Sequence, residues 1–292
     1  MRITQSMLSN NMLRNLSTSY NKMGKLQEQV YTGKKVSRPS DDPVVVMKGM
    51  GYRIQVDKVA QYQRNLGEVH NRLDSSDDAL DTVGKALSRA SELVNKGAND
   101  VLTPEDREKI QSELKQIREQ IQDMANSKVG DKYIFSGTKT STPLYDKANG
   151  YPAAGTAGFD SSVEIEVFDG VSLQVNTNGL ELFAGIDKVF EDLLNNPNPD
   201  HAAFSTAMTE IDGKIDGVLT ARADIGARQN RAEMMENRLD AQEGISKKQM
   251  SENEDVNQAE AITEMITQES IHRAALSVGA RIIQPSLVDF LR

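Results

Sequence analysis

The chain has 292 residues, with no cysteine, no tryptophan and only 5% aromatic residues. The missing cysteines exclude disulfides, thiolate metal sites and cysteine nucleophiles. Few aromatic residues beside 26% charged residues favour long helices with narrow apolar seams over one thick core. The net charge of −9 divides into +6 for residues 1–40 and −15 for residues 41–292. A basic arm fits nucleic acid, anionic lipid or an acidic protein surface, or is a solvated helix face.

The sequence contains no stretch near the roughly 20 apolar residues of a membrane span, so no membrane insertion is expected. The first 30 residues lack the apolar segment of a cleavable signal peptide. They are rich in Ser, Asn and Arg, as a transit peptide is, but their regular apolar spacing argues against one.

A first helix is predicted over residues 3–31, because its apolar residues recur every three or four positions. Gly33 follows at a position where helices commonly end. The cations at 34, 35 and 38 then lie near the negative end of the helix dipole. The apolar stripe consists of Met12, Leu16, Tyr20, Met23, Leu26 and Val30.

Residues 34–41 are predicted to connect this helix to a second one, from 43 to about 96. Asp42 is the expected N-cap and Pro43 the first helical residue. An apolar pattern of this length is typical of a coiled coil. It runs through Tyr62, Leu66, Val69, Leu73, Asp77, Leu80, Gly84, Leu87 and Ser91.

A third helix is predicted to begin at Pro104, with Thr103 as its N-cap, and to end at Gly130. Its seam is formed by Ile110, Leu114, Ile117, Ile121 and Met124.

From residue 131 the chain becomes rich in Gly, Thr, Ser and Pro, with a strand-like segment at 132–135 and a hairpin candidate at 163–175. A two-residue loop would pair Phe168 with Val171 and oppose apolar to polar residues. A three-residue loop, 168–170, pairs Val167 with Val171, Ile165 with Leu173 and Val163 with Val175. The second register unites the apolar faces, so it is preferred, with Gly170 at positive φ.

Helical signals return at about 181–194, and Asp200 is the expected cap of a further long helix. After a polar stretch near 246–255 a last helix follows, closed by Pro285. The late helices are expected to lie antiparallel to the middle ones. The long-helix stripe is Phe204, Met208, Ile211, Ile215, Val218, Arg222, Ile225, Ala232, Met235 and Leu239, and the last one is Ala259, Ile262, Ile266, Ile271, Ala275, Val278 and Ile282.

The predicted fold is mainly α, a long antiparallel coiled-coil or helical rod with paired terminal helices and a small inserted β-rich domain. Three parts are expected. Residues 1–41 with 256–292 form an inner terminal-helix domain and assembly core, residues 42–130 with 181–255 form the rod, and residues 131–180 form the outer insertion.

The sequence offers little support for catalysis. His70, His201 and His272 are isolated and favour helix-surface positions over metal ligation, and no phosphate-binding loop or nucleophile motif is present. The acidic pairs 41/42 and 77/78 favour caps or an exposed face. The twelve methionines fit soft seam fillers. We expect no enzyme activity, no cofactor and no metal.

Both ends of the chain resemble the flagellin superfamily. The family's "TGK" turn and "SDDP" motif correspond to residues 32–34 and 40–43. Its "RADIGARQNR" signature occupies residues 222–231, and its closing motif occupies residues 284–292. The matching motif residues include Ser40, Asp41, Asp42, Pro43, Arg222, Asp224, Gly226, Asn230 and Arg231.

Within the family, "GDKYIFSGTKTSTPLY" at 130–145 and the short insertion resemble the junction members, with a short flagellin as the alternative. The resemblance implies an extracellular flagellar subunit, exported by the type III route without a cleaved signal. It also implies a ring of copies between hook-associated protein 1 and the flagellin filament, and an export chaperone beforehand. A nucleic-acid-binding coiled coil is less favoured, because the basic arm has one aromatic residue in its stripe and no helix-turn-helix.

Self-association is the expected mechanism, because the apolar stripes at both termini have no complete partner within one chain. A close helix approach is expected at Gly226. The predicted assembly interface comprises Met12, Leu16, Met23, Leu26, Val30, Ile262, Ile266, Ile271, Ala275, Val278 and Ile282.

Overall fold

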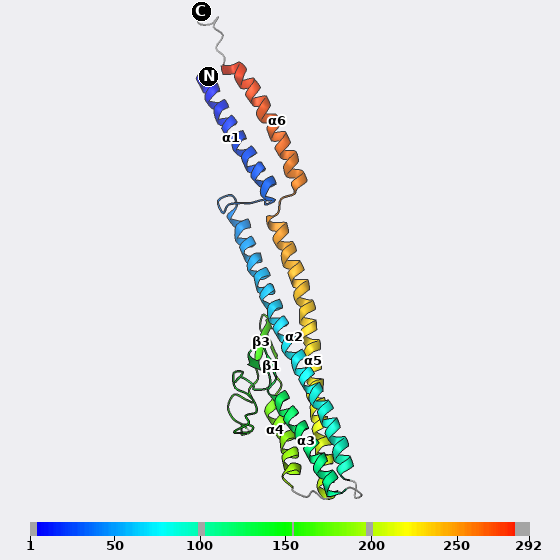
Figure 1. Ribbon diagram of the computed structural model, residues 1–292. Helices are drawn as coiled ribbons and strands as arrows, with labels where there is room; N and C mark the ends of the chain where they lie inside the picture. Colours follow the sequence, from blue (N-terminus) through cyan, green and yellow to red (C-terminus); the bar gives the residue numbers. More distant parts are fainter. Residues whose placement is uncertain (1–4, 99–102, 154, 197–200, 284–292) are drawn as a thin grey trace, which may run out of the picture. The chain divides into compact units, whose positions relative to one another are not determined.

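The computed structural model describes residues 5–98, 103–153, 155–196 and 201–283 (Figure 1). Side chains of residues 5–6, 104 and 281–283 are outside the description. The closing motif at 284–292, with Pro285, and the expected cap at Asp200 also lie outside it. The chain divides into two compact units, residues 1–58 with 243–292 and residues 59–242.

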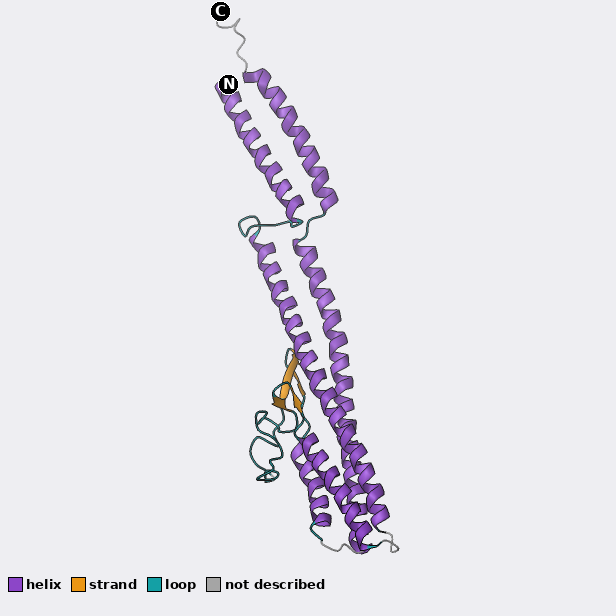
Figure 2. Ribbon diagram, viewed as in Figure 1, coloured by secondary structure: helices purple, strands orange, loops and turns teal. Residues whose placement is uncertain are grey.

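The described ranges are mostly helical, with two small antiparallel sheets of two strands each, which confirms the predicted mainly α fold (Figure 2). The helices are α1 (Gln5–Thr32), α2 (Pro43–Gly97), α3 (Pro104–Ala125), α4 (Gly179–Leu194), α5 (His201–Glu254) and α6 (Gln258–Ile283). The strands are β1 (Lys128–Val129), β2 (Lys132–Tyr133), β3 (Glu164–Phe168) and β4 (Val171–Gln174).

Several predicted helix ends are confirmed by their capping atoms. Gly33 has a φ of +68° and its amide donates to the Gln29 carbonyl, which closes α1. The Asp42 carboxylate accepts from the amides of Val44 and Val45 at the start of α2. The Thr103 side chain accepts from an amide of the first turn of α3. Each cap satisfies backbone groups that have no partner within the helix.

The predicted end of α3 at Gly130 is wrong. The helix ends at Ala125, and Gly130, with a φ of +60°, lies in the turn between β1 and β2. The cause is Asn126, whose side chain donates to the Tyr145 carbonyl at 2.8 Å and accepts from its amide at 2.9 Å. The chain therefore leaves the helix to bind a loop that comes 19 residues later.

The hairpin of β3 and β4 keeps part of the preferred register. Ile165 is paired with Leu173, as predicted, and Gly170 has a φ of +73°. At the tip, however, Phe168 pairs with Val171, so the loop has two residues and the predicted three-residue loop is wrong. A register shift between residues 166 and 168 takes up the extra residue, Val167, as a bulge does.

The second unit holds the apolar core. The α2 leucines at 66, 73, 80 and 87 are all buried, as are Ile211, Val218 and Ile225 of α5. Helices α3 and α4 pack together, and Phe183 of α4 meets Phe135 edge-on with ring centroids 5.0 Å apart. Burial of seams from several helices supplies the main driving force for folding this unit.

The insertion's hairpin lies against the long helices of the same unit. Arg238 of α5 stacks on the Phe168 ring at 4.1 Å, and Asn65 of α2 donates to the Glu166 carbonyl at 2.7 Å. Arg228 of α5 donates to the Asn176 carbonyl at 2.8 Å, just after β4. These contacts tie the small β structure to α2 and α5.

Candidate functional site

In the first unit α1 and α6 lie side by side (Figure 1). The predicted stripe of α1 faces this contact, because five of its six members are half-buried while most other α1 residues are exposed; the sixth, Tyr20, is itself 64% exposed. The half-buried members are Met12, Leu16, Met23, Leu26 and Val30. A helix whose apolar stripe meets only one neighbour remains incompletely covered.

The line of α6 that faces α1 shares only Ala275 with the predicted assembly interface. This buried and half-buried line consists of Ala261, Met265, Gln268, His272, Ala275 and Gly279. Four predicted interface residues instead remain exposed by 40–56%: Ile262, Ile266, Ile271 and Val278. Helix α6 is therefore apolar on both sides of its contact with α1. The side chain of the remaining predicted residue, Ile282, lies outside the description.

An apolar groove of about 560 Å³ opens along the contact of the two helices. It unites five of the predicted residues, namely Met12, Leu16, Ile271, Ala275 and Val278. Leu8 and Ala274 add to its lining, and Leu8 is itself 44% exposed. Exposed apolar surface of this kind marks a binding site rather than a finished core.

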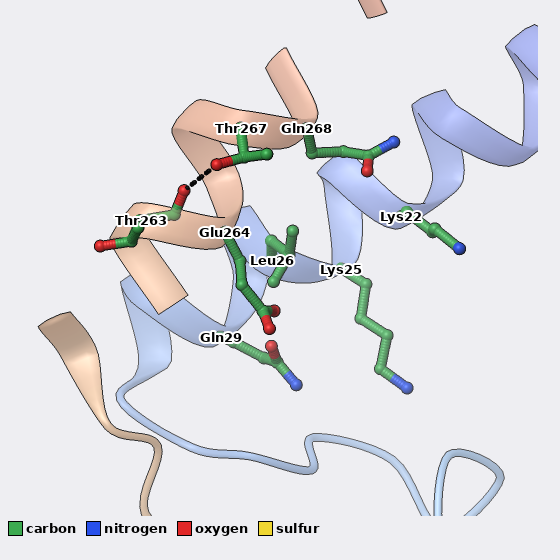
Figure 3. A pocket seen from close by; sticks show the side chains of 8 residues that line it. All are labelled: Lys22, Lys25, Leu26, Gln29, Thr263, Glu264, Thr267 and Gln268. Atoms are coloured by element: carbon green, nitrogen blue, oxygen red, sulfur yellow. Dashed lines mark hydrogen bonds between the residues drawn. The ribbon is translucent and has the colours of Figure 1, made fainter. Parts of the chain in front are cut away.

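A second, more polar groove of about 450 Å³ lies along the same helix pair (Figure 3). Lys22, Lys25 and Gln29 of α1 line it opposite Glu264 and Thr267 of α6. Lys25 also forms an ion pair with Asp41 at 3.3 Å. The two helices of the pair thus leave space on both an apolar and a charged stretch of their contact.

A small polar layer crosses the α1–α6 contact. The buried Ser19 hydroxyl accepts from Gln268 Nε2 at 2.9 Å and lies 3.2 Å from His272 Nδ1. The Tyr20 ring lies 6.1 Å from the His272 ring, centroid to centroid. His272 is therefore part of a helix contact, whereas the sequence indicated a surface residue. A polar layer within an apolar seam penalises shifted helix registers, which would leave its groups unpaired.

The connectors of the first unit are bound to one another in an element that we call the joint, consisting of residues 33–35, residues 254–256 and Arg53. Lys34 Nζ lies 2.6 Å from Asp255 Oδ1 and 3.5 Å from Glu254 Oε2. Arg53 of α2 approaches the same Glu254 oxygen at 2.6 Å. The Asp255 contact, helped by both neighbouring carboxylates, raises the pKa of Lys34. Lys34 and then Ser251 lower the pKa of Asp255.

The "RADIGARQNR" segment lies in the second unit, on α5. Arg222 Nε donates to Asp77 at 2.8 Å and its Nη1 to Asp81 at 2.7 Å, both on α2. The interpretation of Asp77 as part of an exposed face is therefore wrong. Asp77 forms an ion pair with Arg222, the one cation in the apolar stripe of α5. Asp224 pairs with Arg228 one turn later, while Asn230 and Arg231 are exposed.

The expected close approach at Gly226 is wrong within the described part of the chain, because a Cβ there would meet no atom within 4 Å. Glycines with true close approaches are elsewhere. A Cβ at Gly97 would lie 2.5 Å from the Phe204 ring, and one at Gly279 would lie 2.1 Å from Met12 Cε.

The sequence analysis missed a line of exposed apolar residues at the start of α2. Val44, Met47, Met50 and Ile54 are each more than half exposed. Their spacing of three, three and four residues was an available helical signal, and it was not used. The joint was missed as well. No local sequence pattern predicts it, because Lys34 and Asp255 are 221 residues apart.

The described residues contain no group of three His, Asp or Glu side chains placed to hold a metal ion. None of the helices in these ranges is both long and apolar enough to cross a lipid bilayer.

Comparisons with known proteins agree with the motifs. The chain matches the family model of the bacterial flagellin N-terminal helical region over residues 3–140 and that of the C-terminal helical region over residues 208–291, together more than half its length. It is 24% identical to flagellar hook-associated protein 3 of Escherichia coli K12, over 94% of this chain and 95% of the relative. It is also 26% identical to a flagellin of Bacillus subtilis 168, over 97% of each chain. A solved structure described as a flagellar hook-associated protein, from Vibrio parahaemolyticus, has a TM-score of 0.63 at 27% identity and covers 74% of this chain and 100% of that one.

Proposed function

The chain belongs to the bacterial flagellin family, and we propose that it is a structural subunit of the flagellum, of the type of hook-associated protein 3. In this role it forms the junction ring between hook-associated protein 1 and the flagellin filament. Its proposed partners are those two proteins, further copies of itself and an export chaperone. Its proposed place is outside the cell, at the hook–filament junction, reached without a cleaved signal peptide.

The observation that carries this proposal is the incompletely covered α1–α6 pair. Its apolar groove, about 560 Å³ in volume, unites residues from both terminal helices, and α6 is apolar on both flanks of the contact. Apolar flanks of a helix that no neighbour covers in the single chain mark surface on which further elements pack. Helices of adjacent subunits in a ring would supply those neighbours and bury the exposed surface.

The proposal extends to a division of labour among three parts of the chain. We propose that residues 1–41 with 256–292 form the inner assembly core, that residues 42–130 with 181–255 form the rod, and that residues 131–180 form the outer domain. The predicted interface residues Ile262 and Ile266 lie on the opposite flank of α6 from Ile271 and Val278. Two neighbouring subunits, one on each flank, would cover both pairs.

A short flagellin remains the second candidate, because the match to the Bacillus subtilis flagellin extends over 97% of both chains. Deletion of the gene separates the two roles. Loss of the junction subunit leaves hooks without filaments and releases unpolymerised flagellin into the medium. Filaments of normal length in the deletion strain would refute the junction role and favour a minor flagellin.

The interface itself is tested by Val278→Asp, with Ser270→Asp, at an exposed polar residue of α6, as the control. Val278 is 53% exposed in the single chain, so the carboxylate introduced by the substitution stays solvated there and the monomer keeps its stability. In a covered seam the same carboxylate is desolvated, which costs several kcal/mol. We expect secreted monomer, hooks and no filaments for Val278→Asp, and normal filaments for the control. Normal filaments in both strains would refute the interface.

A further inference from the structure

The two interruptions in the helices of the first unit meet at the joint. Residues 33–42 separate α1 from α2, and residues 255–257 separate α5 from α6. Lys34 and Asp255 face each other as an antiparallel backbone bridge. The Lys35 amide donates to the Glu254 carbonyl at 2.6 Å, and the Val256 amide donates to the Gly33 carbonyl at 3.0 Å. Both connectors therefore form one element, although each alone would be a flexible link between helices.

Charged side chains surround this bridge. Glu254 is only 8% exposed at its side chain, yet it receives Arg53 at 2.6 Å and Lys34 at 3.5 Å. Asp255 forms an ion pair with Lys34, and its carboxylate accepts a hydrogen bond from the Ser251 hydroxyl at 2.6 Å. Such pairs depend on charge and geometry, and a buried carboxylate that loses its cations is strongly unfavourable.

Gly49 of α2 makes room for the Glu254 carboxylate. A Cβ at this position would lie 2.1 Å from Oε1 and 3.0 Å from Cδ of Glu254. The carboxylate would have to shift, which disturbs its contacts with Arg53 and Lys34. Gly51, two residues further along the same helix, has no atom within 4 Å of the position of a Cβ. A methyl group is therefore expected to disturb the closed joint at Gly49 and to leave it unchanged at Gly51.

We propose that the joint is a charge-held latch, which when closed ties the α1–α6 pair to the adjoining ends of α2 and α5, and when open lets that pair turn as an intact unit. Opening breaks the bridge and its ion pairs, while the direct contacts of α1 with α6 remain. The latch is a property of the single chain and does not depend on the partner that covers the apolar groove.

Amide hydrogen exchange of the full-length chain tests the proposal, because the amides of Lys35 and Val256 report on the bridge alone. Gly49→Ala is compared with Gly51→Ala, since both add one methyl group and remove one helical glycine from α2. We expect at least about tenfold faster exchange at these two amides in Gly49→Ala, because the displaced carboxylate loses its cations. Exchange in the middle of α1 and α6 should stay as in the wild type, and Gly51→Ala should match the wild type everywhere.

Lys34→Gln provides a second variant, which removes a charge without adding volume. It should accelerate hydrogen exchange at the same amides. About 1 M salt, in which the Debye length is ~3 Å, should also accelerate this exchange, and more in the wild type than in the variant. Three results would overturn the latch: wild-type exchange that ignores salt, equal effects of the two alanine variants, or loss of protection throughout α1 and α6 together with the joint.

Discussion

Arg118 of α3 donates two parallel hydrogen bonds to Asp187 of α4, Nε to Oδ1 and Nη2 to Oδ2, each 2.7 Å long. Gln122 donates a third, also at 2.7 Å, to Oδ1. The Asp187 side chain is 10% exposed and that of Arg118 is 23% exposed. A planar, bidentate pair of this kind fixes the relative rotation of two helices as well as their separation.

Truncation of the cation should therefore be costly. Arg118→Ala leaves the buried Asp187 carboxylate with the hydrogen bond from Gln122, and we expect a loss of about 3 kcal/mol in the free energy of unfolding. Urea unfolding followed by circular dichroism measures it. Arg89→Ala is the control, because Arg89 pairs with Glu92 and Glu113 on the exposed surface, where ion pairs contribute little. Equal losses for both variants would contradict a special role of the α3–α4 pair.

Two glycine-to-alanine changes should shift the free energy of unfolding in opposite directions. In Gly97→Ala the new methyl group would lie 2.5 Å from the buried Phe204 ring, and overpacking of this kind costs about 1–3 kcal/mol. In Gly226→Ala the methyl group meets nothing, so the variant should gain up to about 1 kcal/mol from helix propensity. Thermal unfolding of both variants checks the difference. A destabilised Gly226→Ala would show that the close approach predicted from the sequence exists in the monomer.

Acid should weaken the second unit through the carboxylate of Asp81 on α2, which pairs with Lys85 and Arg222. Lys85, followed by Arg222, lowers the pKa of Asp81 below its ordinary value near 3.8. A carboxylate with a lowered pKa stabilises the fold above that ordinary value, and the contribution is lost as the pH falls through the lowered one. We expect stability to decline below about pH 4, and Asp81→Asn to decline less steeply over that range. Urea unfolding at a series of pH values tests this, and identical slopes would rule out the contribution.

Limited proteolysis of the monomer should remove both ends first and leave roughly residues 42–255. The reason is that the α1–α6 pair leaves much of its apolar surface exposed, so these helices unfold locally at little cost in free energy. Mass spectrometry of the early fragments identifies the cleavage sites. If the terminal helices resist protease as long as the core around Leu80 does, the pair is fully ordered before assembly and the prediction fails.

Sequence patterns predicted best what neighbouring residues decide. The caps at Gly33, Asp42 and Thr103 involve partners within a few positions, so their motifs carried enough information. The end of α3 was wrong because its cause, Asn126, binds Tyr145 in a distant loop. The hairpin kept its Ile165–Leu173 pair, since apolar faces determine register, while a bulge at Val167 changed the turn.

The candidate site was predictable only in part. The α1 stripe follows one helical face and was found, whereas α6 is apolar on several faces. Spacing alone therefore did not separate Ala261 and His272, which face α1, from Ile262 and Ile266, which remain exposed. The role of Asp77 as a partner of Arg222 needed the folded chain, because 145 residues separate the two.

The pair of hydrogen bonds between Asn126 and Tyr145 has a consequence for engineering. It fastens the first half of the insertion to the end of α3, so the stretch that follows begins from an anchored point. Residues 146–149 are exposed, and the isolated bridge between Asp146 and Gly150 closes them into a small loop. A foreign peptide spliced after Lys147 would lengthen a loop whose ends already meet, and doubling a loop's length costs only about 0.6 kcal/mol. The turn at Lys147 is thus a place from which the chain can display an epitope or a tag while its helices fold as before.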